Sequence, residues 1–270
     1  MFWEMNFRTL AWALLLALFS YSNADEENTK DCFGGGPSDI SSDDPDRAAK
    51  AIRKWSDPEA WPEETPATEE PYYWDYSVLG RPMFIRIIKN DNRDGILEVW
   101  LEKESGDQFE LFKTYRISYF SGDIGPKTKQ GDNQAPEGFY FMTRGSLNPN
   151  SSYHISMDLG YPNSYDRHHG RTGNYLMIHG KSVSIGCFAM TDASIEQIYT
   201  LVDAALKSGQ PFVRVHSFPF RMTRENLENH QESPHHDFWK NLAEGWRWFE
   251  ENNSPPNVEL EQGRYVFSES

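Results

Sequence analysis

The chain has 270 residues and carries 26 Lys and Arg against 41 Asp and Glu, a formal net charge of -15. This charge argues against nucleic acid as a partner, because phosphate backbones need a basic surface. Two cysteines are too few for a disulfide scaffold or for a four-thiolate zinc site. The aromatic share of 14% is high, so the chain is able to build a sizeable core.

Residues 1–24 are predicted to be a signal peptide that is removed on export. Residues 10–19 are all apolar, but they are too short to cross a bilayer, which takes about 20 residues. Ser22 and Ala24 supply small side chains at the -3 and -1 positions of a signal-peptidase site. An uncleaved membrane anchor is the alternative interpretation.

Residues 25–70 are acidic and proline-rich, with three consecutive glycines at 34–36. Such a composition buries little apolar surface and predicts a largely disordered leader. One short helix is expected at 45–55, where Pro45 precedes an apolar pattern. We interpret the leader as a solvated linker, and a docking segment for a partner is the alternative.

Residues 71–270 are predicted to form the folded domain. Apolar residues in strand-like patterns occur at 83–88, 97–101, 109–117, 138–142, 175–178 and 212–216. Helical spacing predicts one helix at 192–207, capped by Thr191 or Asp192, and another at about 235–251. A final strand is expected near 258–267. Many strands with few helices predict a mostly β, α+β fold with peripheral helices.

The chemistry concentrates in residues 177–190, with the sequence MIHGKSVSIGCFAM. A thiol is a strong nucleophile only as a thiolate, so a catalytic cysteine needs a base close by. His179 is expected at the end of a strand and Cys187 just before a helix, so the short loop between them is able to bring both side chains together. Gly180 and Gly186 are the predicted oxyanion and positioning residues. On spacing alone, a structural role for Cys187 as a small buried hydrophobe is the alternative.

Other polar residues near this segment are candidates for supporting roles. The Ser184 hydroxyl is placed to orient the histidine or to bind substrate. Lys181 and Arg171 carry charge that would hold a substrate carboxylate. His154, on a possible strand at 153–157, would line the cleft, and His169 is the alternative to His179 as base and a candidate substrate contact.

A metal site is not expected. His230, His235 and His236 are the histidines that would suggest one, but paired carboxylates at ligand spacing are missing beside them. We therefore expect neither a metal nor another cofactor.

Residues 177–190 resemble the signature of the L,D-transpeptidase (YkuD) catalytic domain, in which a Ser-x-Gly-Cys motif follows an Ile-His-Gly strand end. The chain is most similar to the YafK branch, which shares the short interval from histidine to cysteine and the sequence at 186–192. Further matches lie at 134–140, 161–163, 171–173, 219–223, 237–239 and 263–266. The resemblance extends over about residues 80–268 and implies a YkuD-like β-sandwich or sheet fold with a thiol nucleophile and no metal.

The resemblance also implies a periplasmic enzyme of cell wall biogenesis and cell shape. It would attack peptidoglycan stem peptides at diaminopimelate-linked bonds, with Cys187 as nucleophile and His179 as base. The acyl group would then pass to an amine, which makes a cross-link, or to water. The YafK branch is associated with hydrolysis that detaches an outer-membrane lipoprotein from peptidoglycan, so both outcomes stay open. A non-catalytic wall-binding module and a metal-dependent amidase are the rival interpretations.

The sequence departs from the general pattern of the family in three places. Ile185 and Ala189 replace a usual His and a common Arg, and the interval from His179 to Cys187 is about half the usual one. These changes favour hydrolysis, since a less enclosed thioester is easier for water to reach. Cys32, in the leader, is positioned to form a disulfide with Cys187 and switch the enzyme off, and a surface thiol without consequence is the alternative.

Overall fold

The computed structural model describes residues 44, 46–57, 75–106 and 108–270. The predicted signal peptide, most of the predicted leader and Cys32 lie outside the described residues. Within the described ranges, the longest helices are neither apolar enough nor long enough to cross a membrane.

The first of two five-stranded sheets, sheet A, has the order β3-β2-β1-β10-β5. Its strands are β1 (Met83–Ile88), β2 (Ile96–Glu102), β3 (Phe109–Arg116), β5 (Gly138–Met142) and β10 (Val213–Phe218). β1 and β10 run parallel, and the other pairs are antiparallel. All five strands were predicted to within two residues at each end, because each is long enough to show its alternation of buried side chains.

The second sheet, sheet B, has the order β4-β9-β8-β7-β6. Its strands are β4 (Tyr119–Phe120), β6 (Leu147–Asn148), β7 (Ser156–Asp158), β8 (Met177–His179) and β9 (Phe188–Ala189). The sequence predicted β8 with its start at 175 rather than at Met177. It also predicted a possible strand at 153–157, which overlaps β7 only at Ser156 and Met157. Strands of two or three residues are too short to display a period of two, so the pattern did not reveal the others.

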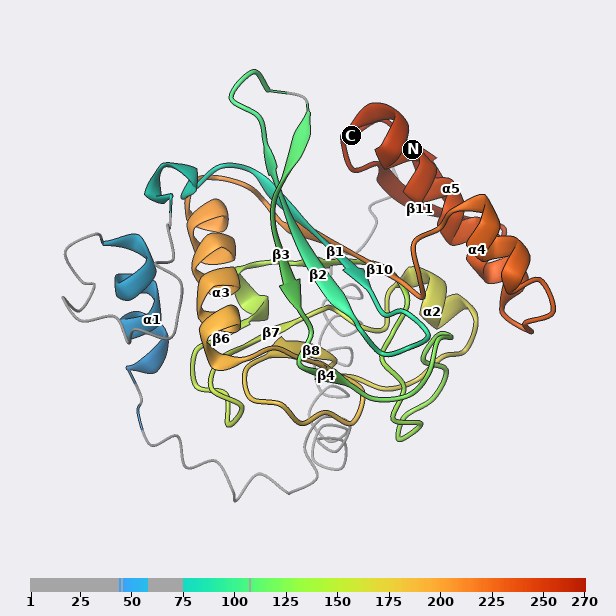
Figure 1. Ribbon diagram of the computed structural model, residues 1–270, viewed down its shortest axis with the longest axis horizontal. Helices are drawn as coiled ribbons and strands as arrows, with labels where there is room; N and C mark the ends of the chain where they lie inside the picture. Colours follow the sequence, from blue (N-terminus) through green and yellow to red (C-terminus); the bar gives the residue numbers. More distant parts are fainter. Residues whose placement is uncertain (1–43, 45, 58–74, 107) are drawn as a thin grey trace, which may run out of the picture.

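Sheet A separates two cores. The inner core joins sheet A to sheet B and α3 (Asp192–Lys207), and it includes Ile85, Val215, Met157, Ile178 and Phe188. The outer core lies between sheet A and α5 (His236–Asn252), and it includes Phe139, Phe218, Trp239, Leu242 and Trp246. Figure 1 shows α3 and α5 on opposite sides of the sheets. The predicted mostly β, α+β class with peripheral helices is confirmed.

Several smaller elements connect these layers. Thr191 caps α3 by accepting a hydrogen bond from Ser194 N, as predicted. The short helices α2 (Ser164–His168), α4 (Arg224–Asn229), η3 (Tyr76–Val78) and η4 (Arg144–Ser146) were not predicted.

The prediction of a single strand near 258–267 is wrong. A hairpin of β11 (Asn257–Glu261) and β12 (Arg264–Ser268) replaces it. Gln262 and Gly263 both have positive φ, 48° and 79°, and two consecutive left-handed residues turn the chain back on itself.

The helix expected at 45–55 is present as α1 (Arg47–Ser56), but it is not solvated as we expected for this part of the leader. Trp55 is 3% exposed and belongs to the inner core. Its indole N–H donates to Glu196 Oε2 of α3 at 3.2 Å, and Lys54 Nζ lies 3.4 Å from the same oxygen. The sequence therefore predicted the helix, but its acidic, proline-rich surroundings did not reveal that the helix packs on the domain.

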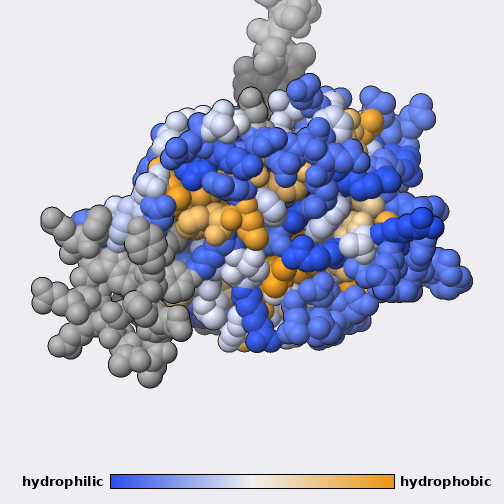
Figure 2. Space-filling model, turned by 45° about the horizontal axis from the view of Figure 1, so that its top comes forward, coloured by the Kyte–Doolittle hydropathy of each residue, from blue (hydrophilic) through white to orange (hydrophobic). Residues whose placement is uncertain are grey.

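The surface is largely hydrophilic, and hydrophobic residues form several small patches on the face in Figure 2. Among the large apolar side chains, Tyr175 and Val183 are unusually exposed, at 44% and 57%. Both lie close in sequence to the predicted site residues His179 and Cys187.

Candidate active site

The parallel pair of β8 and β9 brings His179 and Cys187 to one face of sheet B. Ile178 is in register with Phe188, and both side chains enter the inner core. Because side chains alternate along a strand, His179 and Cys187 both point to the opposite face, as diagonal neighbours. The expectation that Cys187 comes directly before the helix is wrong, since β9 intervenes and its pairing with β8 fixes this arrangement.

The protonation state of His179 suits a general base. Its Nδ1 lies 2.6 Å from the Gly180 carbonyl oxygen, and a carbonyl only accepts, so Nδ1 carries the proton. Its Nε2 is buried and has no hydrogen-bond partner in the structure. Burial lowers the pKa of His179 to about 4, so the imidazole is neutral near pH 7. The lone pair of Nε2 is therefore available to receive a proton.

Gly180 holds this histidine through close packing. Its N–H donates to the carbonyl oxygens of Tyr153 and Ile155 at 3.0 and 3.2 Å. A Cβ at Gly180 would lie only 2.6 Å from Asp192 Oδ1 and 2.7 Å from the Cβ of His154. The predicted positioning role of Gly180 thus has a steric cause: a side chain here would push the backbone that supports His179.

Substitution of Gly180 by Ala is expected to lower kcat/KM by about 100-fold, since a displacement of roughly 1 Å is enough for such a loss. Gly145→Ala is the matched control, because the nearest atom to its new Cβ would be 3.7 Å away. Both variants are assayed for turnover and for thermal unfolding. Equal activity of Gly180→Ala and Gly145→Ala would contradict the positioning role.

Two residues beside His179 were not found from the sequence. The ring of Tyr153 lies 4.8 Å from the imidazole, centroid to centroid. Ser156, on β7, is directly paired with His179, so its side chain points to the same face. Its Oγ is buried and without a hydrogen-bond partner. A lone serine in a three-residue strand carries no sequence signal, and only the pairing reveals its position.

The loop before Cys187 is fixed by Ser184. The Ser184 hydroxyl donates to the Cys187 carbonyl at 2.7 Å and accepts from the Gly186 N–H at 3.1 Å. Ser184 therefore orients the peptide of the cysteine rather than the histidine that we predicted. Gly186 has φ 138°, a conformation that disfavours any residue with a Cβ. The Gly186 N–H is already engaged, so an oxyanion would have to compete with Ser184 for it.

The sulfur of Cys187 is fully buried and accepts a hydrogen bond from the N–H of Met177 at 3.2 Å. Such a bond stabilises a thiolate once the thiol is free. In this structure Cys187 is disulfide-bonded, and its partner lies outside the described residues. The Tyr175 carbonyl oxygen lies 3.7 Å from the sulfur, which places the exposed Tyr175 ring on the segment beside the nucleophile.

Lys181 and His154 border the site. The Lys181 ammonium donates to the Ser152 carbonyl at 2.6 Å, and the residue is exposed. The expectation that His154 is part of a strand is wrong, since β7 starts at Ser156 and His154 has φ 71°. Its Nε2 lies 2.9 Å from Glu196 Oε1, on the carboxylate that also accepts from Trp55.

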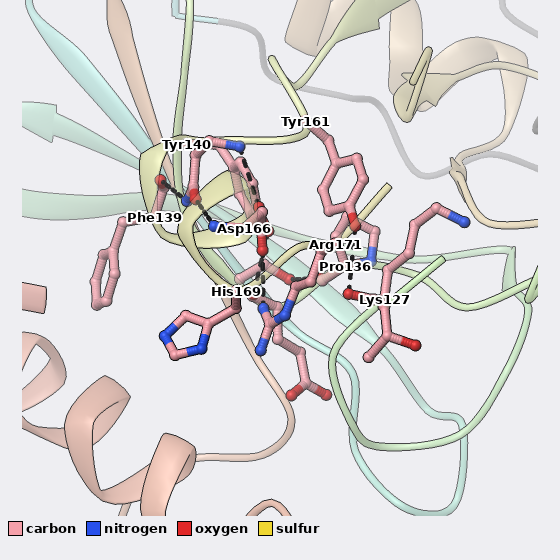
Figure 3. Close-up of polar contacts among 12 residues, drawn as sticks. Lys127, Pro136, Phe139, Tyr140, Tyr161, Asp166, His169 and Arg171 are labelled. Carbon is pink, nitrogen blue, oxygen red and sulfur yellow. Dashed lines mark hydrogen bonds and ion pairs between the residues drawn. The ribbon is translucent and has the colours of Figure 1, made fainter. Parts of the chain in front are cut away.

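His169 and Arg171 lie in a different cluster (Figure 3). His169 follows α2, and its Nε2 donates to the Gly263 carbonyl at 2.8 Å. Arg171 pairs with the buried carboxylate of Asp166 at 2.8 Å, and Figure 3 shows the two side chains pointing toward each other. The Asp166 carboxylate also accepts from the Tyr140 hydroxyl at 3.1 Å. These contacts give His169 and Arg171 partners within the fold, and the substrate contact of either residue stays a prediction.

The described part of the chain contains no group of three or more His, Cys, Asp or Glu side chains arranged to hold a metal ion. His230 instead lies 2.8 Å from Asp91 Oδ2 and stacks on Phe220 at 4.4 Å. His235 is the N-cap residue of α5, and His236 is its first residue. The three histidines that raised the question of a metal therefore do not converge on one point.

Comparisons with known proteins identify the family of the chain. A family model described as YkuD, the L,D-transpeptidase catalytic domain, matches residues 99–216. The Escherichia coli K12 protein named "Putative L,D-transpeptidase YafK" is 43% identical over 204 residues, which is 76% of this chain and 80% of that protein. The O157:H7 strain has a relative with the same figures.

Two solved structures are also similar. The helical cell shape determining protein Pgp2 from Campylobacter jejuni matches at 18% identity with a TM-score of 0.40, covering 68% of this chain and 76% of Pgp2. A point mutant of Pgp2 matches at 23% identity with a TM-score of 0.41, covering 63% of this chain and 57% of that one.

Proposed function

Because the chain belongs to the L,D-transpeptidase (YkuD) family, we propose that it is a cysteine enzyme that opens a peptide bond in peptidoglycan through an acyl-enzyme on Cys187. The family acts on peptidoglycan, and the finer assignments concern this chain's own residues. They are the nucleophile, the base, the bond and the fate of the acyl group.

One observation carries the proposal. The unprotonated Nε2 of His179 is buried and unpartnered on the same face of sheet B as Cys187. A buried acceptor without a partner is costly unless the site uses it. Proton transfer from the Cys187 thiol, and later to the leaving amine, is the use that this geometry supports best.

The reaction proceeds in two halves. His179 Nε2 takes the proton from the Cys187 sulfur as the sulfur attacks the carbonyl carbon of a stem-peptide bond at diaminopimelate. The backbone N–H of Cys187 would stabilise the developing oxyanion, and that of Gly186 would do so only in place of its hydrogen bond to Ser184. The imidazolium then gives its proton to the leaving amine, the C–N bond breaks, and a thioester remains on Cys187.

The fate of the thioester decides between two functions. An acceptor amine that gives its proton to His179 would form a new amide, which is transpeptidation. A water molecule activated in the same way would give a carboxylate and free thiol, which is hydrolysis. Ala189 is fully buried in register with His179, so the arginine common at this position in the family is not present to seat an acceptor. We therefore favour hydrolysis that releases a wall-linked lipoprotein, with transfer as the other candidate.

In this proposal the protein is located in the periplasm, where it has access to the peptidoglycan. The apolar run at 10–19 and the small residues before position 25 support export by a cleaved signal peptide. Cell fractionation with N-terminal sequencing of the mature protein tests this location.

Incubation with isolated wall tests the proposed function directly. With dithiothreitol present, residues 25–270 are added to peptidoglycan with bound lipoprotein and to peptidoglycan without it, and the fragments are identified by mass spectrometry. Cys187-dependent release of lipoprotein without new cross-links would support the hydrolase. New diaminopimelate cross-links without release would establish the transferase instead, and no change in either substrate would refute both.

Activity is expected to require a reductant, because Cys187 reacts only as a free thiol. Cys32 is the other cysteine of the 270-residue sequence and lies outside the described residues. Protein isolated without reductant should be inactive, dithiothreitol should restore turnover, and Cys32→Ser should be active without it. Wild-type turnover that is equal with and without dithiothreitol, or peptide mapping that finds no link between the two cysteines, would overturn the redox switch.

A further inference from the structure

A cavity of about 380 Å³ lies on the outer face of sheet A, away from the face of sheet B that carries Cys187 and His179. Its walls come from β5, β10, the start of α2 and the hairpin of β11 and β12. The strands of sheet B contribute none of the residues that line it. The volume falls within the range of sites for small ligands.

Two arginines line this cavity without an acidic partner. Arg214 donates through Nη2 to Asn257 Oδ1 at 2.7 Å, and its guanidinium lies over the ring of Phe212 at 5.0 Å. Arg167 donates to the carbonyl of Pro162. Neither forms an ion pair with a described carboxylate, and the residues that line the cavity include no acid. A guanidinium has five N–H donors, so both keep donors for an anion in a chain of net charge -15.

His216 adds a buried imidazole to the wall of the cavity. It lines the cavity, is 2% exposed, and packs against the rings of Phe84 and Phe139 at 5.2 and 4.8 Å. Burial, with Arg214 and Arg86 nearby, lowers the pKa of His216 to about 3. The neutral imidazole keeps one N–H, which is able to donate to an acceptor in the cavity. An anion in the cavity would supply that acceptor.

The remaining wall is aromatic. Phe141 is 57% exposed and lies 5.5 Å from Phe212, and the Phe139 ring points away from the Asp166 and Arg171 pair (Figure 3). Rings of this kind pack against a flat apolar group. An inorganic anion would leave that wall without a contact, whereas an organic acid with a ring would use both the wall and the arginines.

We propose that this cavity is a second binding site, for a small organic carboxylate with an aromatic or other flat apolar group. The carboxylate bridges Arg214 and Arg167 and accepts from His216, and the flat group packs against the exposed ring of Phe141. The site does not depend on the proposed wall chemistry, since it shares no lining residue with the Cys187 site.

Titration with N-acetylphenylalanine tests the site, with N-acetylphenylalanine amide and inorganic phosphate as the other arms. We expect saturable binding of the acid below about 1 mM and at least about 10-fold weaker binding of the amide, as one lost charge-assisted contact would give. The His216 imidazole signals in the NMR spectrum should shift with the acid alone. No saturation up to about 10 mM, or equal binding of acid and amide, would overturn the proposal, as would equal binding of phosphate.

Variants locate the site within the fold. Arg214→Gln and Arg167→Gln should each weaken binding of the acid about 10-fold, and Arg93→Gln, at an exposed arginine paired with Asp123, should leave it unchanged. Two arginine variants are used so that the test does not depend on the folding of one. Circular dichroism checks that both variants are folded. Cys187→Ser should bind the acid like the wild type, so failure here is distinguishable from failure of the proposed activity. Wild-type affinity in both arginine variants would place the ligand elsewhere.

Discussion

Replacement of Cys187 by Ser is expected to reduce turnover by about 10⁴-fold or more, the size of loss seen when a nucleophile that acts with a base is removed. The cause lies in the base as well as in the nucleophile. The pKa of His179 is about 4, which is several units lower than the pKa of an ordinary thiol, near 8.5. His179 is therefore a weak base even toward a thiol. A serine hydroxyl is much less acidic than a thiol, so this histidine would not activate it. Turnover is measured by release of wall fragments.

The fold should survive this substitution, since the N–H of Met177 that contacts the sulfur is able to donate to a hydroxyl as well. Stability is compared with the wild type in the presence of reductant, because the change also removes the disulfide. Ser184→Ala is the matched control: it keeps the thiol and loses only the hydrogen bonds that orient the Cys187 peptide. A variant Cys187→Ser that still releases fragments at a tenth of the wild-type rate would exclude the thiol mechanism.

The long helices and strands of this fold are predicted well from the sequence. α3 was predicted with the bounds 192–207 that the structure has, because Thr191 caps it and its apolar face repeats over four turns. The strands of sheet A are similarly clear. Sheet B is not, and yet it carries the candidate site. Its strands are only two or three residues long, so their pairing is decided by contacts between distant segments rather than by local pattern.

The same contrast applies to the site. His179 and Cys187 were predicted as a pair because they lie only eight positions apart and a motif surrounds them. Ser156 was not, since it reaches the site through the pairing of β7 with β8. The contact of His169 with Gly263 joins segments that are distant in the sequence. The ion pair of Arg171 with Asp166 depends on the fold of the loop after α2. Charge and residue type suggested a substrate contact for both, and only the structure shows that each has a partner within the fold.

Replacement of His179 by Ala should lower kcat/KM by about 10²- to 10⁴-fold, the usual contribution of a general base. His169→Ala should lower kcat/KM by less than about 2-fold, because His169, which follows α2, donates from Nε2 to the Gly263 carbonyl of the hairpin. Both variants are assayed on wall fragments with reductant present. A dead His169→Ala together with an active His179→Ala would show that the base is assigned to the wrong histidine.

The pH profile separates a base from a residue that merely packs beside the nucleophile. His179 must be neutral to take the proton, so activity is lost as the pH falls through its pKa. Burial holds that pKa at about 4 instead of the ordinary 6.5, and the acid limb of kcat/KM should therefore lie near pH 4, with full activity retained at pH 6. In His179→Ala the residual rate should have no acid limb in that range. A wild-type limb near 6.5 would mean that His179 is hydrated in the free enzyme, and an unchanged limb in His179→Ala would assign it to another group.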